Sequence, residues 1–265
     1  MLLMSTREAN IGVDSGHASH EAAIECDPQL AEVALWAAIR GTAFEKAYLA
    51  EREACYQELD LELRSRAFSA LDQDWFVRLD IAQVALQACS EWPSIMSKVN
   101  RCILAPCLRP QEEGAELFGA HERKAGLQEK PNLVIRIQPA SLARPSHLQS
   151  LLRHELMHIN DMLDPHFRYD PSLEQFHDEL GIPNAIRERY RILWDMYIDG
   201  RIAHSGQLGP EARARRLREF KPLFRVLDIH TLDAFNSIFD ADTLDHPTIL
   251  AYARCPQSFL VKGDL

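Results

Sequence analysis

The sequence lacks a surplus of basic residues. Its 29 Lys and Arg stand against 39 Asp and Glu, which gives a net charge of −10 over 265 residues. Proteins that bind nucleic acids usually carry a basic field, and anionic membrane surfaces attract basic patches. We therefore expect neither nucleic acid nor membrane among the partners of this protein.

Long apolar runs are also missing. No stretch approaches the roughly 20 apolar residues needed to cross a bilayer. The first eight residues, Met1 to Glu8, have neither the basic start nor the apolar segment of a secretory signal. These two features predict a cytoplasmic protein.

Close cysteine pairs are scarce. Six cysteines are scattered along the chain, and only Cys102 and Cys107 lie near each other. Their spacing is wider than that of a zinc-binding pair, and no second pair exists. The pattern is typical of reduced cytosolic thiols rather than of a disulfide framework.

What the chain does contain is the pattern of a predominantly helical α+β protein. We expect a loosely ordered lead-in over residues 1–27, a helical region over 28–100 and a metal-binding region with C-terminal helices over 101–265. Short apolar runs separated by Pro and Gly predict strands. These runs are Cys102 to Ala105, Ala115 to Phe118 and Leu133 to Ile137.

Two long helices are predicted in the third region. Ser146 is a suitable N-terminal cap for a helix that runs to about Leu163. Pro183 is a favourable first-turn residue for a helix that ends near Gly206. Shorter helices are expected over 210–220, 232–239 and 247–254.

The first long helix carries the sequence His-Glu-Leu-Met-His at positions 154–158. Residues four apart lie above one another on a helix, so the imidazoles of His154 and His158 can meet on one cation. Neutral imidazole is a good zinc ligand, and the adjacent Glu155 can act as general base toward a water held by the metal. Flanking leucines imply partial burial, and two buried imidazoles without a partner would be costly. We therefore prefer a Zn²⁺ site over two structural histidines.

A catalytic zinc usually has three protein ligands. The second long helix offers Asp195, with Asp199 four residues later on the same face. We expect Asp195 as the third ligand and Asp199 as acceptor of a histidine N–H, because ligating histidines usually donate their other N–H to a carboxylate or carbonyl. Alternatively, Asp195 and Asp199 are surface carboxylates that form ion pairs with Arg191 or Arg201 and bind no metal.

Two aspartates close to the motif are alternative ligands. Asp164 lies six residues after His158, but the sharp turn that this ligation needs has no glycine. Asp161, three residues after His158, is better suited to a supporting or capping role near the helix C-terminus.

These residues resemble the zincin metallopeptidases. The second helix is similar to the gluzincin branch, in which a third ligand is followed four residues later by an Asp that orients the first histidine. This sequence departs from that branch by having Asp195 where Glu is usual. In the metzincin branch Asp164 would be the ligand above a Met-turn, but Met196, the only later methionine, lies in a predicted helix. The resemblance covers residues 133–206.

The resemblance implies a zincin-like fold, in which a small mixed sheet packs on the motif helix and on a second metal-ligand helix. It also implies an edge strand that aligns an extended peptide, for which we expect Leu133 to Ile137. The implied activity is hydrolysis of peptide bonds in a peptide or protein substrate. A zincin-like domain without turnover, or a helical binding protein with a coincidental motif, are the alternatives.

Peptide hydrolysis also needs a donor for the oxyanion. Four side chains are candidates, and the sequence does not select among them: Tyr169, Tyr190, Tyr197 and His204. A basic cluster from Arg213 to Lys221 is typical of a solvated helix face.

Overall fold

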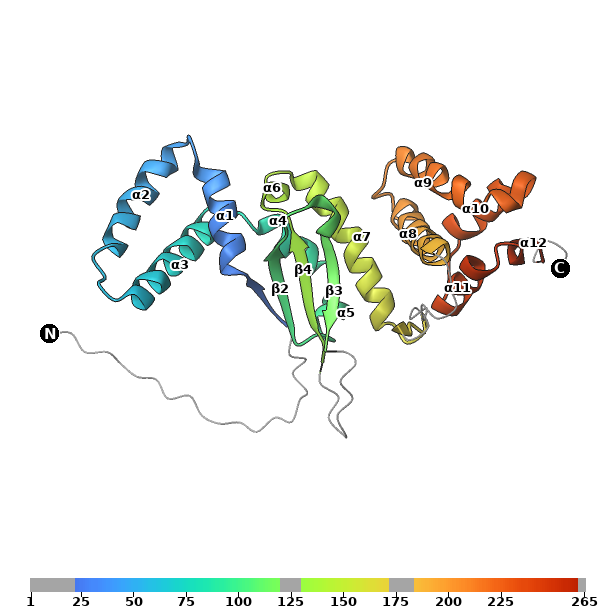
Figure 1. The fold of residues 1–265 in the computed structure, drawn as a ribbon, viewed down its shortest axis with the longest axis horizontal. Helices are drawn as coiled ribbons and strands as arrows, with labels where there is room; N and C mark the ends of the chain where they lie inside the picture. The colour runs from blue at the N-terminus through green and yellow to red at the C-terminus, as the bar shows by residue number, and fades with distance from the viewer. Residues whose placement is uncertain (1–21, 120–129, 172–183, 262–265) are drawn as a thin grey trace.

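The computed structural model describes residues 22–119, 130–171 and 184–261. The protein is mostly helical, with one small mixed sheet, as the α+β prediction requires. In Figure 1 the sheet lies in the middle of the molecule, with helices α2 and α3 on one side and helices α8 to α11 on the other. Most of the expected lead-in, and the expected helix start at Pro183, lie outside the described residues.

The sheet has four strands in the order β1-β2-β4-β3. These are β1 (Ala23–Cys26), β2 (Arg101–Pro106), β3 (Gly114–Phe118) and β4 (Asn132–Ile137). Strands β1, β2 and β4 are parallel, and β3 runs antiparallel to β4. The three predicted strands are confirmed. Strand β1 was not predicted, because its few residues fall in the segment expected to be a loosely ordered lead-in.

The edge strand differs from the prediction. Leu133 to Ile137 lies inside the sheet, since β4 pairs with β2 on one side and with β3 on the other. Alternate residues of β4, such as Leu133 and Ile135, are fully buried. The antiparallel edge next to helix α7 is instead β3. Position in a sheet depends on pairing between distant segments, which a local pattern does not reveal.

Five helices lie between strands β1 and β2 in the chain. Helices α2 and α3 extend away from the sheet, and two shorter helices lead into β2 (Figure 1). The five helices are α1 (Pro28–Ile39), α2 (Ala43–Cys55), α3 (Leu61–Arg78), α4 (Gln83–Ser90) and α5 (Pro93–Met96). Helices α1 and α4 share one core with the sheet and α7, so no change of core marks the boundary expected at residue 100.

Helix α7 (Pro145–Leu163) packs one apolar face on the sheet core. This face recurs every three or four residues through Leu148, Leu152, Leu156 and Ile159, all fully buried. The helix starts two residues earlier than predicted, with Arg144 rather than Ser146 at the cap position. Pro145 occupies its first turn, and no side chain caps it, so the cap role expected of Ser146 is wrong.

The C-terminal part of the chain forms a second core around α8 (Asn184–His204). Helices α9, α10 and α11 pack against it, and their bounds agree closely with the predicted helices. They are α9 (Pro210–Leu223), α10 (Thr231–Phe239) and α11 (His246–Arg254). Short helical segments complete the described chain: η1 (Pro110–Glu112), α6 (Pro139–Leu142), η4 (Arg225–His230) and α12 (Ser258–Val261).

Helices α7 and α8 lie against each other where the two cores meet. The face of α7 opposite the sheet therefore meets the middle of α8. Among the described residues, no helix combines the length and apolar character needed to cross a membrane.

Candidate metal centre

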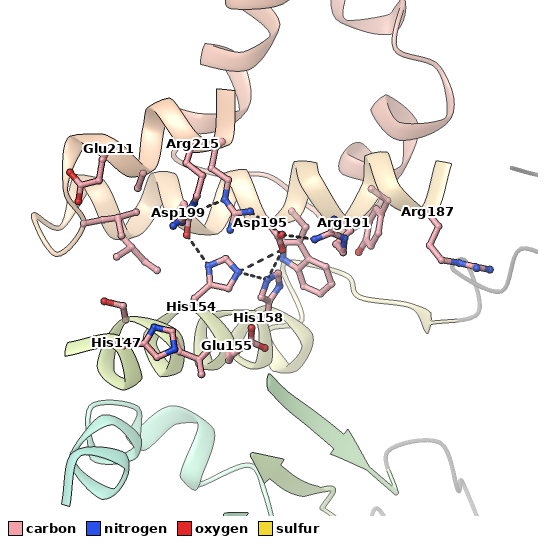
Figure 2. Close-up of a pocket in the computed structure, with 18 residues that line it drawn as sticks. His147, His154, Glu155, His158, Arg187, Arg191, Asp195, Asp199, Glu211 and Arg215 are labelled. Carbon is pink, nitrogen blue, oxygen red and sulfur yellow. Dashed lines mark hydrogen bonds and ion pairs between the residues drawn. The ribbon is translucent and has the colours of Figure 1, made fainter. Parts of the chain in front are cut away.

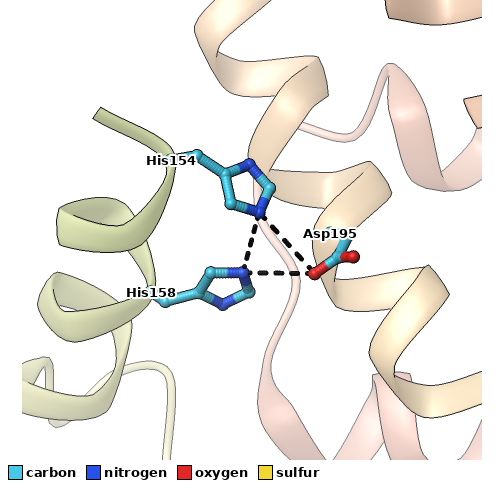
Figure 3. A group of neighbouring side chains, drawn as sticks. All are labelled: His154, His158 and Asp195. Atoms are coloured by element: carbon cyan, nitrogen blue, oxygen red, sulfur yellow. Dashed lines mark hydrogen bonds and ion pairs between the residues drawn. The ribbon is translucent and has the colours of Figure 1, made fainter. Parts of the chain in front are cut away.

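The two motif histidines project from α7 toward α8, as Figures 2 and 3 show. Their Nε2 atoms lie 3.2 Å apart. Both side chains are largely buried, at 15% and 14% exposure for His154 and His158. The four-residue spacing on an unbroken helix brings the two imidazoles together, as predicted.

Asp195 reaches the same point from α8 (Figure 3). Its Oδ1 atom lies 3.3 Å from the His158 Nε2 and 3.6 Å from the His154 Nε2. In the described part of the chain, these three residues form the one group of His, Cys, Asp or Glu side chains whose ligand atoms all lie within 4.8 Å of one another.

The spacing of these three atoms suits a zinc ion. Ligands held tetrahedrally at roughly 2.0–2.1 Å from zinc are separated from one another by about 3.3–3.4 Å. The observed separations of 3.2, 3.3 and 3.6 Å fall around this value. Two imidazole nitrogens and one carboxylate oxygen are also a donor set that zinc favours. The residues therefore fit the ion in both chemistry and spacing.

Asp199 lies one helical turn beyond Asp195 and holds the first histidine. Its Oδ1 is 2.8 Å from the His154 Nδ1, and its side chain is only 3% exposed. A carboxylate in this position fixes the ring orientation and favours the tautomer that presents Nε2 to a metal. The contact expected between Asp199 and a histidine is thus present.

Arg216 of α9 forms ion pairs with both aspartates. It donates from Nε to the Asp199 Oδ2 at 2.6 Å and from Nη1 to the Asp195 Oδ2 at 3.2 Å. Arg215 donates a further bond to the same Asp199 oxygen at 3.2 Å. Arg216 is itself buried. In each aspartate, Oδ1 faces the histidines and Oδ2 faces an arginine.

Titration of the site reflects these contacts. Burial lowers the pKa of His154, but hydrogen bonds and charges from Asp195 and Asp199 outweigh it and raise this pKa to about 9. Burial raises the pKa of Asp195, but hydrogen bonds from both histidines and the charge of Arg216 hold it well below its usual range. Without a metal the carboxylates therefore stay ionised, and a cation that binds His154 would displace a proton from it.

Glu155 points away from the histidine pair toward the edge of the sheet (Figure 2). Its Oε2 accepts a hydrogen bond from the backbone N–H of Ala115 in β3, at 3.2 Å. A Cβ atom on the neighbouring Gly114 would lie 3.2 Å from the same oxygen, so the glycine leaves room for the carboxylate. Glu155 therefore connects the motif helix to the edge strand.

The alternative ligands have other roles. Asp161 is buried and accepts hydrogen bonds from Arg201 and from the Trp194 Nε1, so it ties α7 to α8. Asp164 accepts from the backbone and side chain of His166 in the turn after α7. Neither belongs to the three-residue group. Arg201, an expected partner of the Asp195–Asp199 pair, is thus engaged by Asp161 instead.

An open cleft of about 800 Å³ exposes the site. The histidines, Glu155, Asp195 and Asp199 all line it. Of the four oxyanion candidates only Tyr190 lines it as well, and its hydroxyl lies 2.8 Å from the His246 Nδ1. The Tyr197 hydroxyl instead accepts from the Leu244 backbone N–H.

Arg216 was not predicted as part of the site. The basic cluster predicted a solvated helix face, yet Arg216 is the buried member of that cluster. Two signals pointed to it. The acidic pair needed compensation, and the helix over 210–220 has apolar residues, Ala212 and Phe220, four residues to either side of Arg216 on its buried face.

Comparisons with protein-family models, with curated proteins and with solved structures find no match to this chain.

Proposed function

We propose that this protein is a zinc-dependent peptidase of zincin-like construction. The observation that carries the proposal is the meeting of the His154, His158 and Asp195 ligand atoms in an open cleft that Glu155 also lines. His154, His158 and Asp195 would hold the ion, and three protein ligands leave a tetrahedral zinc one position for water or substrate. When bound, zinc supplies a Lewis acid that polarises a carbonyl and lowers the pKa of water toward about 7.

Glu155 is the proposed general base. It takes a proton from the attacking water and passes it to the leaving amine, the two transfers that peptide hydrolysis requires. Its hydrogen bond to the Ala115 N–H keeps the carboxylate in the cleft beside β3. Asp199 and Arg216 act through other groups, since Asp199 orients His154 and Arg216 orients both aspartates.

Strand β3 is the proposed docking edge for substrate. The Ala115 N–H points away from β4, because it reaches Glu155 of α7. In an antiparallel ladder the direction of backbone groups alternates along the strand, so Leu117 also directs its N–H and C=O to the free edge. An extended peptide that adds to this edge places its backbone next to Glu155. This position supports peptides over compact small molecules as substrates.

A Glu155→Gln variant tests the proposal. The amide keeps the size of the side chain but takes up no proton, so we expect zinc content to be unchanged and hydrolysis to fall at least about 100-fold. The measurement is cleavage of a quenched fluorescent peptide library beside elemental analysis. Glu62→Gln, on exposed α3, is the matched control and should keep full activity.

Full turnover in Glu155→Gln would exclude Glu155 as the base. Zinc in the unaltered protein together with an absence of cleavage would instead leave a metal-binding protein without peptidase turnover.

A further inference from the structure

Two arginines extend along one end of the cleft. Arg187 and Arg191 both line it, two turns and one turn before Asp195 on α8 respectively. Figure 2 shows them leading away from the histidine pair, while His147, Glu211 and Arg215 flank the opposite end. The two ends of the cleft therefore differ in charge.

These two guanidinium groups are only weakly engaged by the protein. Arg191 is 62% exposed, and its Nη1 lies 3.5 Å from the Asp195 Oδ2, an oxygen that Arg216 already contacts at 3.2 Å. Arg187 is exposed and has no ion pair or hydrogen bond within residues 22–119, 130–171 and 184–261. Arg189, between them, is by contrast bound to the Leu223 carbonyl at 3.1 Å.

Arg187 and Arg191 are like charges one helical turn apart, and such a pair on a helix repels weakly. The i,i+4 contact between Arg191 and Asp195 offsets part of this repulsion. Neither arginine contributes to the core, so both guanidinium groups are available to a ligand in the cleft.

The charge of the cleft contrasts with that of the whole chain. Four carboxylates among its lining residues are balanced by four arginines, and a divalent ion at the histidines would make the cleft positive. The chain as a whole carries −10. A positive cleft in an acidic protein attracts and orients anionic ligands.

We propose that Arg187 and Arg191 form a carboxylate-binding subsite that selects peptides with a Glu or Asp side chain at this end of the cleft. The inference rests on the proposed peptidase function and names its substrate class. A guanidinium binds a carboxylate through paired, charge-assisted hydrogen bonds, and two guanidinium groups one turn apart can share one side chain.

The test uses binding rather than turnover. Short capped peptides in which one Glu is moved along an Ala/Ser background, each with a Gln counterpart, are titrated into the zinc-loaded full chain carrying Glu155→Gln. An uncharged fluorophore reports binding by anisotropy. At one or two adjacent positions we expect Glu to bind about tenfold more tightly than Gln, with a ratio that falls as salt rises.

Arg187→Gln together with Arg191→Gln should bring that ratio to about one, as expected when both charge-assisted bonds are lost. Arg218→Gln, an exposed arginine of α9 outside the cleft lining, should leave it unchanged. Equal affinity for Glu and Gln at every position, or a preference that survives the double substitution, would overturn the subsite.

The subsite and the peptidase activity can fail separately. Cleavage of peptides without charge preference would overturn the subsite and leave the peptidase proposal intact. Selective binding of Glu peptides, with no cleavage by the unaltered chain, would overturn the peptidase proposal and leave the subsite intact.

Discussion

Arg216 lies between two carboxylates that would otherwise face each other on one side of α8. Its Nε and Nη1 contact Asp199 and Asp195, and its Nη1 also contacts the Glu219 Oε2 at 2.8 Å. The side chains of Arg216, Asp195 and Asp199 are all buried. Buried carboxylates without a cation are strongly destabilising, so this arginine stabilises the metal-free protein.

Replacement of Arg216 by Met tests this role. We expect the free energy of unfolding to fall by about 3–5 kcal/mol in the metal-free protein, because two buried aspartates lose the buried arginine that they share. With zinc present the loss should be smaller, since the ion supplies positive charge to Asp195. Urea denaturation with chelator and with zinc measures the difference.

Arg218→Met is the matched control, because Arg218 is exposed on the same helix. It should change the unfolding free energy by less than about 0.5 kcal/mol. An equal loss for Arg216→Met with and without zinc would show that the guanidinium acts through packing alone.

At the scale of residues, helix spacing predicted a useful part of the site. Positions 154 and 158, and positions 195 and 199, had to share helix faces, and the structure brings the two pairs together. Their role as metal ligands stays a prediction. Arg216 was not predicted because its partners lie 17 and 21 residues away on another helix, and spacing along one helix does not reveal such a contact.

Close packing between α8 and α10 fixes the position of α8, and with it the positions of Asp195 and Asp199. A Cβ atom on Gly200, directly after Asp199, would lie 1.9 Å from the Phe239 carbonyl oxygen. The two helices can approach this closely because the glycine has no side chain. The position of Asp199 over His154 depends on this contact.

Gly200→Ala should therefore move α8 away from α10. We expect a loss of at least about 1–3 kcal/mol in unfolding free energy, as in other overpacked cores, with weaker zinc binding. Chemical denaturation and zinc titration measure the two effects. At Gly209 an added Cβ would meet only the movable Glu211 side chain, so Gly209→Ala is the control and should cost less than about 1 kcal/mol. Unchanged zinc affinity in Gly200→Ala would contradict the link between this contact and the site.

Among the elements, the long amphipathic helices were the most predictable. The apolar repeat of α7 and the β-branched run of β4 are local signals, and both elements are where they were expected. The order of strands was not predictable, because β3 reaches the edge by pairing with a later strand. Strand β1 pairs with a segment nearly 80 residues later, and its four residues carry no strong pattern of their own.

For the whole molecule, the candidate site lies where two buried cores meet. Helix α7 belongs to the core that contains the sheet, and α8 belongs to the core of the C-terminal helices. His154 and His158 therefore come from one body and Asp195 from the other. A zinc ion at this point would join the two cores, whose apolar side chains lie directly beside its ligands, as the His158 and Trp194 rings show with centroids 4.5 Å apart.

Composition and patterning predicted the mixed, mainly helical class of the molecule. They did not predict that the N-terminal helices α1 and α4 share a core with the sheet, since that depends on which apolar faces meet in three dimensions.

The central claim is that His154, His158 and Asp195 bind zinc, and elemental analysis of the full chain purified without a histidine tag tests it most directly. We expect about one zinc per chain, as for a three-ligand catalytic site, its loss in His158→Ala, and its retention in Asp164→Ala, where the altered residue lies outside the site. An absence of zinc from the unaltered protein after zinc is supplied, or equal zinc in His158→Ala, would contradict the account.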